Sequence, residues 1–363
     1  SNIVLHFVTP AEVEEYFDQC VAHGFNGFWC KLATNGADGA LYLDYNGEAP
    51  FTGTIFQSPL NDPHWDNWEL IFTAAAARGL TAWVFPTWAG FDDTEGDRIE
   101  MEAASNAQME DYGEAVGNRF KDYPNIIWMN GGDKGSPGAT LVARWGAVAT
   151  GIQSTGDTHL WGLHGVRGVT KASYISSAGM GSQPFDICTI YQDSADPMGD
   201  AATEYADDIG PTIAYELPHE NGNGLGGDNP TLDRLRLEYW GPFVAGSCGH
   251  VFGNRPRWHM GLAGPPYSVT GVTYEETWDD PDGDDDRGTD DFSVYANYIA
   301  SLDGDWADMV PDTTDTFLTS GEGTGATRSG ARFNDTRTVG TLAIAYRPHG
   351  GSSSLTFDLT ELA

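Results

Sequence analysis

The stretch RFKDYPNIIWMNGGD, residues 119–133, decides the fold class. Its apolar run 126–129 is typical of a short buried strand, and the apolar residues of 109–120 before it recur at helical spacing. After the strand, two glycines let the chain turn sharply toward Asp133. A helix followed by a buried strand with a polar end is the repeating unit of sheets made of parallel strands.

The same unit recurs on both sides of this stretch. Apolar strand-like runs occupy residues 26–33, 80–85, 126–129, 158–163, 185–191, 212–215 and 250–252. Helical patterns lie between them, one beginning at the capping signal Thr9-Pro10-Ala11-Glu12 and another covering 232–244. Strands that are apolar along their whole length are buried on both faces, as in a barrel or an open doubly wound sheet. No GxGxxG motif follows an early strand, which counts against a dinucleotide-binding fold.

We therefore expect an α/β fold, a (β/α)8 TIM barrel over residues 1–311, followed by a small antiparallel β domain over 312–363. One barrel strand is missing from the count of eight; it is either compressed into 2–8 or absent from this chain. The β domain is predicted from period-two runs at 331–334, 338–346 and 353–359. Its pattern stops in mid-run at Ala363, which leaves open whether the domain is incomplete.

Charge and cysteine usage exclude several classes of function. The chain has 18 Lys+Arg against 53 Asp+Glu, and its net charge of −35 repels phosphate backbones, so we expect no nucleic-acid partner. No apolar run is long enough to cross a membrane. The composition suits an extracellular or virion-associated protein. Cys20, Cys30, Cys188 and Cys248 form no CxxC pair, so we expect buried free thiols and no zinc.

No cofactor or metal ion is expected. The acidic run 279–286 is interpreted as a solvated loop. A calcium site is the alternative for this run, although the EF-hand spacing is not met.

Two carboxylates lie where a barrel enzyme carries its chemistry, at the carboxyl ends of strands. Asp133 follows the strand 126–129, and Glu216 follows the strand 212–215. Glycoside hydrolysis needs such a pair: one group protonates the leaving oxygen, and the other is a nucleophile or base at the anomeric carbon. The structural alternative is that Asp133 caps the next helix and Glu216 pairs with a cation.

Other polar and aromatic residues near strand ends are candidate substrate ligands. They are Trp88, Asn130, His164, Tyr191, Gln192, Glu220, Asn254 and Trp258. Trp88 and Trp258 are expected to be at least partly exposed as platforms for sugar rings, whereas Trp128 lies inside a strand and should be buried.

Several stretches carry a resemblance to a known family. They are AHGFNGFWCK (22–31), AAARGLTAWVFPTW (75–88), RFKDYPNIIWMNGGD (119–133), YELPHE (215–220), FGNRPRWHM (252–260) and ASLDGDWADMVPD (300–312). The chain resembles the apiosidase-like glycoside hydrolases, long a domain of unknown function and often followed by a small β domain labelled collagen-binding. The resemblance covers nearly the whole chain, and 119–133 is its most specific part.

This resemblance implies a barrel of the large retaining clan of glycosidases. It implies that Asp133 is the acid/base, that Glu216 is the nucleophile, and that His164 matches a family histidine. The chain departs from the family at three places: Gln192 leads into Asp193 rather than toward a histidine, His219 stands before Glu220 where Tyr is usual, and Phe252 replaces a common Tyr. The family's plant-glycan substrates are therefore not assumed.

Two functions remain in competition at this point. The first is a retaining glycoside hydrolase that cleaves a polysaccharide or a glycan side chain. The alternative is a non-catalytic carbohydrate-binding or virion structural protein on the same barrel, in which assembly into a larger particle is open. A metal-dependent hydrolase is disfavoured because the sequence has no HxH-type ligand cluster.

Overall fold

The computed structural model describes residues 5–33, 43–91, 96–177, 179–191, 194–215, 218–221, 230–258, 274–279, 287–334, 342–351 and 354–362. The chain divides into two compact units. The first consists of Ser1–Cys188 and Pro256–Gly271, and the second of Thr189–Arg255 and Val272–Ala363. Each unit is described by itself. The expected domain boundary near residue 311 stays a prediction.

Six parallel strands follow one another in the order of the sequence. They are β1 (Gly27–Lys31), β2 (Thr81–Phe85), β3 (Ile126–Gly131), β4 (Trp161–His164), β5 (Ile187–Ile190) and β6 (Thr212–Ala214). In the first unit, Trp29 of β1 is opposite Trp83 of β2, and Gly131 of β3 is opposite His164 of β4. In the second unit, the Tyr215 N–H donates to the Ile190 carbonyl after β5. This order of parallel strands with helices between them confirms the predicted fold class, a TIM-barrel fold with small C-terminal antiparallel sheets.

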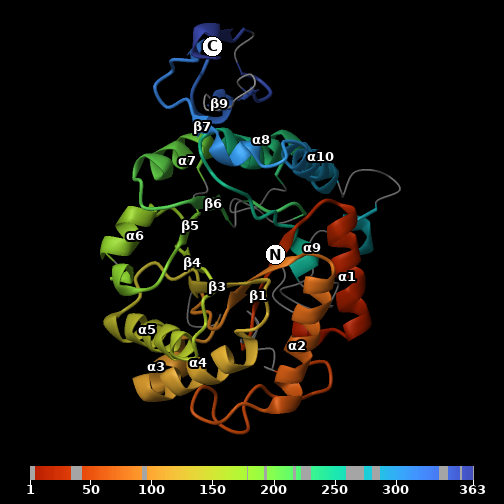
Figure 1. The fold of residues 1–363 in the computed structure, drawn as a ribbon, viewed down its shortest axis with the longest axis vertical. Helices are drawn as coiled ribbons and strands as arrows, with labels where there is room; N and C mark the ends of the chain where they lie inside the picture. Colours follow the sequence, from red (N-terminus) through yellow and green to blue (C-terminus); the bar gives the residue numbers. More distant parts are fainter. Residues whose placement is uncertain are drawn as a thin grey trace. The chain divides into compact units, whose positions relative to one another are not determined.

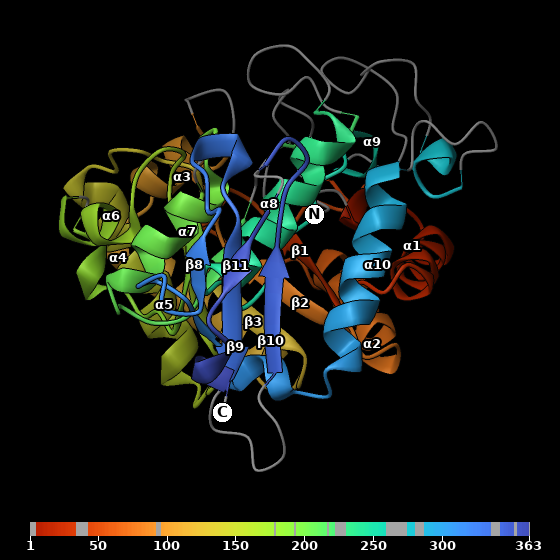
Figure 2. The same cartoon turned by 90° about the horizontal axis from the view of Figure 1, so that it is seen from above.

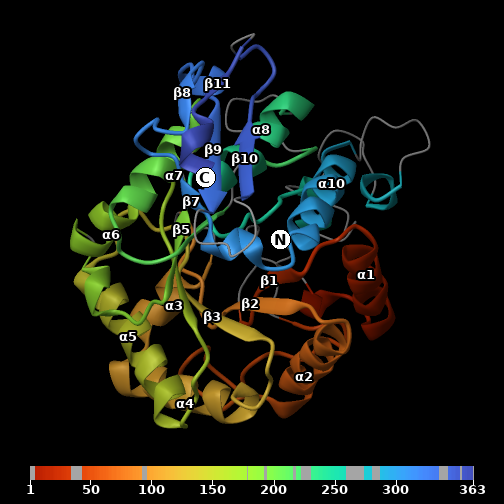
Figure 3. The same ribbon diagram turned by 45° about the horizontal axis from the view of Figure 1, so that its top comes forward.

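Helices connect the strands. They are α1 (Pro10–Ala22), α2 (Asp62–Ala77), α3 (Arg98–Ala103), α4 (Asn106–Phe120), α5 (Ala139–Ser154), α6 (Lys171–Ser177), α7 (Pro197–Ala206), α8 (Leu232–Val244), α9 (Arg255–Trp258) and α10 (Arg287–Ser301). In the first unit, α1, α2, α4 and α5 lie on the outer side of β1–β4 (Figure 1; Figure 3). The predicted start of α1 is confirmed: Thr9 and Glu12 form a reciprocal capping box, with Pro10 in the first turn. Short 3-10 helices complete the described elements: η1 (Leu5–Phe7), η2 (Met180–Ser182), η3 (Glu275–Thr277), η4 (Asp305–Asp308), η5 (Gly325–Thr327) and η6 (Leu359–Leu362).

One strand prediction needs correction, and the question of the first barrel strand is answered in part. Residues 5–7 form the 3-10 helix η1, so the described part of 2–8 does not supply that strand, and residues 2–4 lie outside the described residues. The segment 250–252 is not a regular strand. Among the described residues, His250 forms an isolated parallel bridge with Ala214, and Asn254 forms another with Glu220 further along the chain. The segment follows β6 closely, because the Val251 N–H donates to the Ala214 carbonyl and the Glu220 N–H to the Gly253 carbonyl.

The C-terminal residues form two small antiparallel sheets in the second unit (Figure 2). One has the order β10 (Leu342–Tyr346), β9 (Gly330–Asn334), β7 (Val310–Pro311), and the other joins β11 (Thr356–Phe357) to β8 (Leu318–Ser320). Phe317, Leu318 and Ala331 form their shared core. The buried Arg332 of β9 donates to the carbonyls of Phe243 and Ser247, which fixes this sheet to the end of α8.

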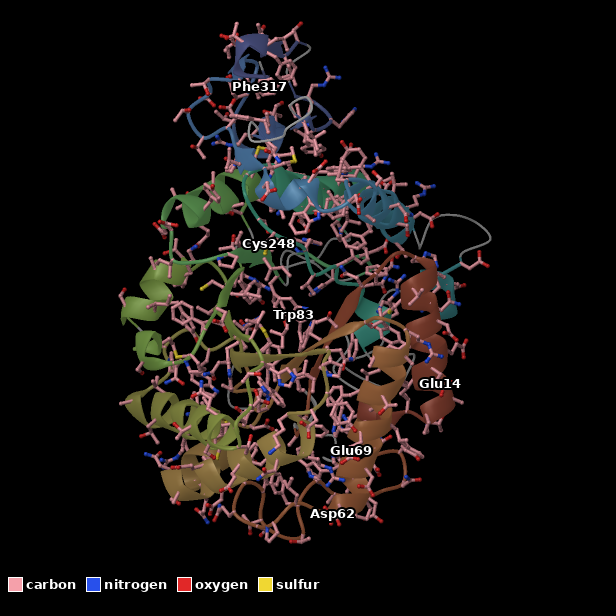
Figure 4. The ribbon with its side chains drawn as sticks, viewed as in Figure 1. Glu14, Asp62, Glu69, Trp83, Cys248 and Phe317 are labelled. Atoms are coloured by element: carbon pink, nitrogen blue, oxygen red, sulfur yellow. The ribbon has the colours of Figure 1, made fainter. Side chains whose placement is uncertain are left out.

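Several acidic side chains of the first unit lie on helices. Figure 4 labels Glu14 on α1 and Asp62 and Glu69 on α2. Three acids of α2, namely Asp62, Asp66 and Glu69, surround Arg119 of α4. Exposed ion pairs of this kind contribute little stability, roughly 0–1 kcal/mol each. The carboxylates of Asp62, Asp66 and Glu69 remain exposed to solvent in these ion pairs.

The structure also bears on the predicted free cysteines and on the predicted absence of a membrane span. Cys20, Cys30 and Cys188 are buried free thiols as predicted, and Cys248 is a free thiol that is partly buried. Burial raises the pKa of the Cys20 thiol to about 11, so it stays protonated and unreactive. Among the described residues, no helix is long and apolar enough to cross a membrane.

Candidate active site

The carboxyl end of β3 presents Asp133 through three successive residues with left-handed backbone. The φ angles are +104° at Gly131, +120° at Gly132 and +57° at Asp133. A β-carbon on Gly131 would lie 2.2 Å from the His164 carbonyl oxygen, and one on Gly132 would lie 2.9 Å from the backbone nitrogen of Ala89. Only glycine fits at either position. The turn that the sequence predicts is therefore imposed by both torsion angle and space.

Asp133 itself has an uncommon conformation. A non-glycine residue with positive φ is strained, although Asp tolerates this region better than most residues. Strain of this kind persists where surrounding structure enforces it, and it concentrates at functional sites. Asp133 is 9% exposed, so most of its surface is covered by protein while part still reaches solvent.

His164 fixes the backbone of Asp133 from the neighbouring strand. Its ring is fully buried at the end of β4, and its Nδ1 accepts a hydrogen bond from the Asp133 backbone N–H at 3.3 Å. Because Nδ1 acts as the acceptor, the imidazole hydrogen is placed on Nε2 in this arrangement. The structure thus brings together two of the predicted site residues, Asp133 and His164.

Asn130 is also at this strand end, but its contacts are internal. Its Oδ1 accepts from the Gly131 N–H at 3.2 Å, and its Nδ2 donates to Gln183 Oε1 at 3.1 Å. Gln183 Nε2 in turn donates to the carbonyl of Val142 on α5. Asn130 therefore braces the start of the glycine turn, and its role as a substrate ligand stays a prediction.

The expectation that Trp88 is partly exposed is wrong: only 1% of its surface is exposed. It stacks on Trp29 at 5.5 Å between ring centroids, and its ring lies edge-on to His164 at 5.1 Å. Lys31 Nζ lies 3.9 Å from the Trp88 ring centroid, which is a close cation–π contact. The prediction failed because it considered only the position after a strand and not the side chains that cover it. Trp128 is fully buried, as predicted.

In the second unit, hydrogen bonds to the carboxylate of Glu220 hold this side chain inside the protein. Its Oε2 accepts from Asn254 Nδ2 and from Thr289 Oγ1, each at 3.0 Å, and its Oε1 accepts from the Gly288 N–H. Gly288 and Thr289 begin α10, so the carboxylate also faces the positive end of that helix. Asn254 is 1% exposed. The two predicted ligands are thus brought together, in a buried network.

The structure describes only some of the remaining predicted site residues. Tyr191 is buried after β5, with 3% of its surface exposed. Trp258 ends α9, but its side chain lies outside the described residues, as do Glu216, Gln192 and the stretch 280–286. The separation of Asp133 and Glu216 stays a prediction for that reason. Within the described ranges, no group of three or more His, Cys, Asp and Glu side chains is arranged to hold a metal ion.

Sequence reasoning missed several residues that shape this site. Lys31 ends β1 and could have been found by the same strand-end rule. Asp97 is fully buried and exchanges backbone contacts with Trp88, its N–H donating to the Trp88 carbonyl at 2.7 Å. Gln183 and Tyr174 come from loops and short helices after strands, where the sequence has no periodic signal.

Comparison with known proteins identifies the class and then the family. The order of the parallel strands defines a protein of the TIM-barrel class, with a carboxylate at the end of β3. The Apiosidase-like catalytic domain matches residues 3–303, and the chain belongs to this family, which confirms the resemblance seen in the sequence. The chain is therefore a glycoside hydrolase. Comparison with curated proteins gave no match.

Solved structures share the fold at low sequence identity. A glycoside hydrolase of family 5 from Bacteroides vulgatus is 20% identical, with a TM-score of 0.77 over 100% of this chain and 78% of that chain. A structure described as a glycoside hydrolase is 18% identical, with a TM-score of 0.71 over 97% and 89%. The endo-1,4-beta-mannanase of Rhizomucor miehei is 14% identical, with a TM-score of 0.55 over 83% and 94%. At these identities the likeness establishes the fold alone.

Proposed function

We propose that this chain is a retaining glycoside hydrolase that cleaves a polysaccharide or a glycan side chain, with Asp133 as acid/base and Glu216 as nucleophile. The observation that carries the proposal is the Gly131-Gly132 turn, which holds Asp133 at the carboxyl end of β3 in left-handed backbone against His164. A residue that only capped the next helix would not need this conformation. α5 begins six residues later, and its N-cap is Gly138.

The proposed reaction has two steps. In the first, Asp133 gives its proton to the glycosidic oxygen while the Glu216 carboxylate attacks the anomeric carbon, forming a glycosyl ester and releasing the leaving alcohol. In the second, Asp133 takes a proton from water as that water attacks the same carbon, and the Glu216 carboxylate leaves. The anomeric configuration is inverted twice and is therefore retained.

The two roles predict unequal variants. Asp133→Ala should keep activity on aryl glycosides with good leaving groups, which need little protonation, and azide should accelerate its second step. Glu216→Ala should lose turnover of every substrate, because no glycosyl ester can form. Glu220→Ala serves as the rival test. If it abolishes turnover in folded protein while Glu216→Ala stays active, the nucleophile is assigned to the wrong residue.

Stereochemistry gives an independent test. Proton NMR of the first product should show the retained anomer, and a first product of inverted configuration would refute the retaining assignment. In a structure that orders both side chains, the two carboxyl groups should be about 5–5.5 Å apart, whereas an inverting pair would be about 6.5–9.5 Å apart.

Substrate and location are part of the same proposal. The departures at Asp193, His219 and Phe252 call for product analysis over a broad glycan panel. β-Mannan belongs in that panel because a mannanase shares the fold. The charge of −35 supports an extracellular or virion-associated location, since a strongly charged surface keeps a protein soluble and separate. Mass spectrometry of culture medium and of purified particles would test it.

A further inference from the structure

Tyr174 is a buried tyrosine that the sequence analysis did not select. It belongs to α6, the first helix after the carboxyl end of β4, and only 1% of its surface is exposed. Its hydroxyl group has no hydrogen-bond partner in the described part of the chain. Native proteins rarely leave a buried hydroxyl in this state, so it needs an explanation.

A continuous set of contacts leads from Tyr174 to Asp133. The loop after β3 packs onto the loop after β4: the Asp133 N–H bonds to His164, and a β-carbon on Gly135 would be 3.6 Å from a methyl group of Val166. Gly165 follows His164, and a β-carbon there would be 4.0 Å from the Tyr174 ring. The ring of Tyr174 therefore lies beside the loop after β4, which packs onto the loop that carries Asp133.

Electrostatics also connects the two residues. Burial raises the pKa of Tyr174 above its ordinary value, and the negative charge of Asp133 raises it further. The hydroxyl consequently keeps its hydrogen near neutral pH, where it acts as a donor toward a carboxylate. Other ionisable groups near these loops include Lys134 beside Asp133, His164 on β4, Arg167 in the loop after β4 and Lys171 on α6. Lys31 and Asp97 both contact Trp88.

We infer that the Tyr174 hydroxyl is a positioning group for Asp133: it donates a hydrogen bond to the Asp133 carboxylate when that group is ionised. The inference rests on the proposed function, in which Asp133 is protonated for the first step and ionised for the second. When Asp133 is protonated, a hydrogen bond from the Tyr174 hydroxyl to it contributes little free energy. In the second step, the carboxylate turns toward α6 and accepts the bond, which holds it in place to take a proton from water.

The test is Tyr174→Phe, which removes the hydroxyl and keeps the ring. The pKa of Asp133 is measured by ¹³C NMR of labelled aspartate carboxyls, with Asp133→Asn used to assign the signal. Tyr239→Phe is the matched control for the pKa of Asp133, because Tyr239 is also a buried tyrosine whose hydroxyl has no partner among the described residues. Its charged neighbours include Asp291, Arg236 and Glu220, and Asp133 is not among those that shift its pKa. We expect Tyr174→Phe to raise the pKa of Asp133 by about one unit, and Tyr239→Phe to leave it unchanged.

Kinetics and stability provide further readouts. The rate of the deglycosylation step should fall about tenfold in Tyr174→Phe, whereas KM changes little. At a pH where Asp133 is ionised, the Tm should fall slightly, because the variant loses the hydrogen bond to the carboxylate. At a pH where Asp133 is protonated, the Tm should stay the same or rise. An unchanged pKa of Asp133 overturns the inference, and so does a Tm loss with an unchanged deglycosylation rate, which would indicate a packing role alone.

Failure of the proposed function has a different signature. If Asp133→Ala keeps full activity on unactivated glycosides, the acid/base assignment is wrong whatever Tyr174 does. The NMR titration still reports whether Tyr174 donates to Asp133, so the two failures can be told apart.

Discussion

Replacing Glu220 with Gln tests whether this carboxylate holds the second unit together or takes part in chemistry. The substitution keeps the size of the side chain and removes its charge. In the structure, the two carboxylate oxygens accept from three donors: Asn254 Nδ2, Thr289 Oγ1 and the Gly288 N–H. A glutamine has one acceptor oxygen, so at least one of these donors would face an amide NH₂ group.

The magnitude follows from these contacts. If the amide oxygen serves Asn254 and Thr289, each bond loses charge assistance, which we take as about 1 kcal/mol per bond. The Gly288 N–H would then be buried without an acceptor, which costs about 1–3 kcal/mol. The interaction with the N-terminus of α10 contributes about 0.5 kcal/mol more. The free energy of unfolding should therefore fall by about 4 kcal/mol.

Thermal and chemical unfolding of purified protein measure this loss. With an unfolding entropy of about 2 cal/mol/K per residue, 4 kcal/mol lowers the Tm by about 5 °C if the chain unfolds as a whole, and by about 12 °C if the second unit unfolds alone. Thr289→Val removes one of the three donors and should give about a third of the effect. Glu220→Gln with an unchanged Tm and a large loss of turnover would refute this reasoning and make Glu220 a catalytic residue.

Two other predictions follow from particular positions. Gly131→Ala should lower the free energy of unfolding by about 2–4 kcal/mol and kcat/KM by at least tenfold, because a β-carbon would lie 2.2 Å from the His164 carbonyl oxygen at a φ of +104°; wild-type kinetics and Tm in this variant would contradict the account of the turn. Burial and the neighbouring His219 lower the pKa of His250 to about 3, below the value of about 6.5 in unfolded chain. This contribution to stability is complete above pH 6.5 and is lost as the pH falls, by about 1.4 kcal/mol per unit and about 2 kcal/mol at pH 5. The free energy of unfolding, measured with urea at pH 7 and pH 5, should therefore change less with pH in His250→Phe than in the wild type. An equal change in both proteins would contradict the lowered pKa of His250.

The periodic elements were predictable from the sequence because burial itself is periodic. All six parallel strands lie within or overlap the predicted apolar runs, and α1 begins at the predicted capping box. The strands β7 and β8 were missed because two or three residues carry no periodic pattern. The segment 250–252 was predicted as a strand from its apolar residues, but among the described residues it forms an isolated parallel bridge with β6 and no regular strand. The apolar composition of a segment does not determine how many of its residues pair with a neighbouring strand.

The sequence predicted the candidate site only where the backbone conformation allows a single residue type, as it does at the two glycines before Asp133. The two glycines before Asp133 mark a turn that no other residue can make, so their positions in the sequence identified the strand end. The internal role of Asn130 and the buried network of Glu220 depend on partners at Gln183, Gly288 and Thr289, distant in the chain. Long-range partners of polar groups have no signature in a single sequence.

Trp88 shows how an incorrect expectation leads to a better account of the site. Its ring does not offer an open face for a sugar, because Lys31 lies over it and Trp29 stacks on it. A β-carbon on Gly132 would be 3.1 Å from the Trp88 ring, so the ring lies directly against the turn that carries Asp133. The ring also contacts His164, which accepts the Asp133 N–H. Trp88 therefore supports the backbone of Asp133 from two sides, and an aromatic residue after a strand can act on the chemistry by holding a turn rather than by touching substrate.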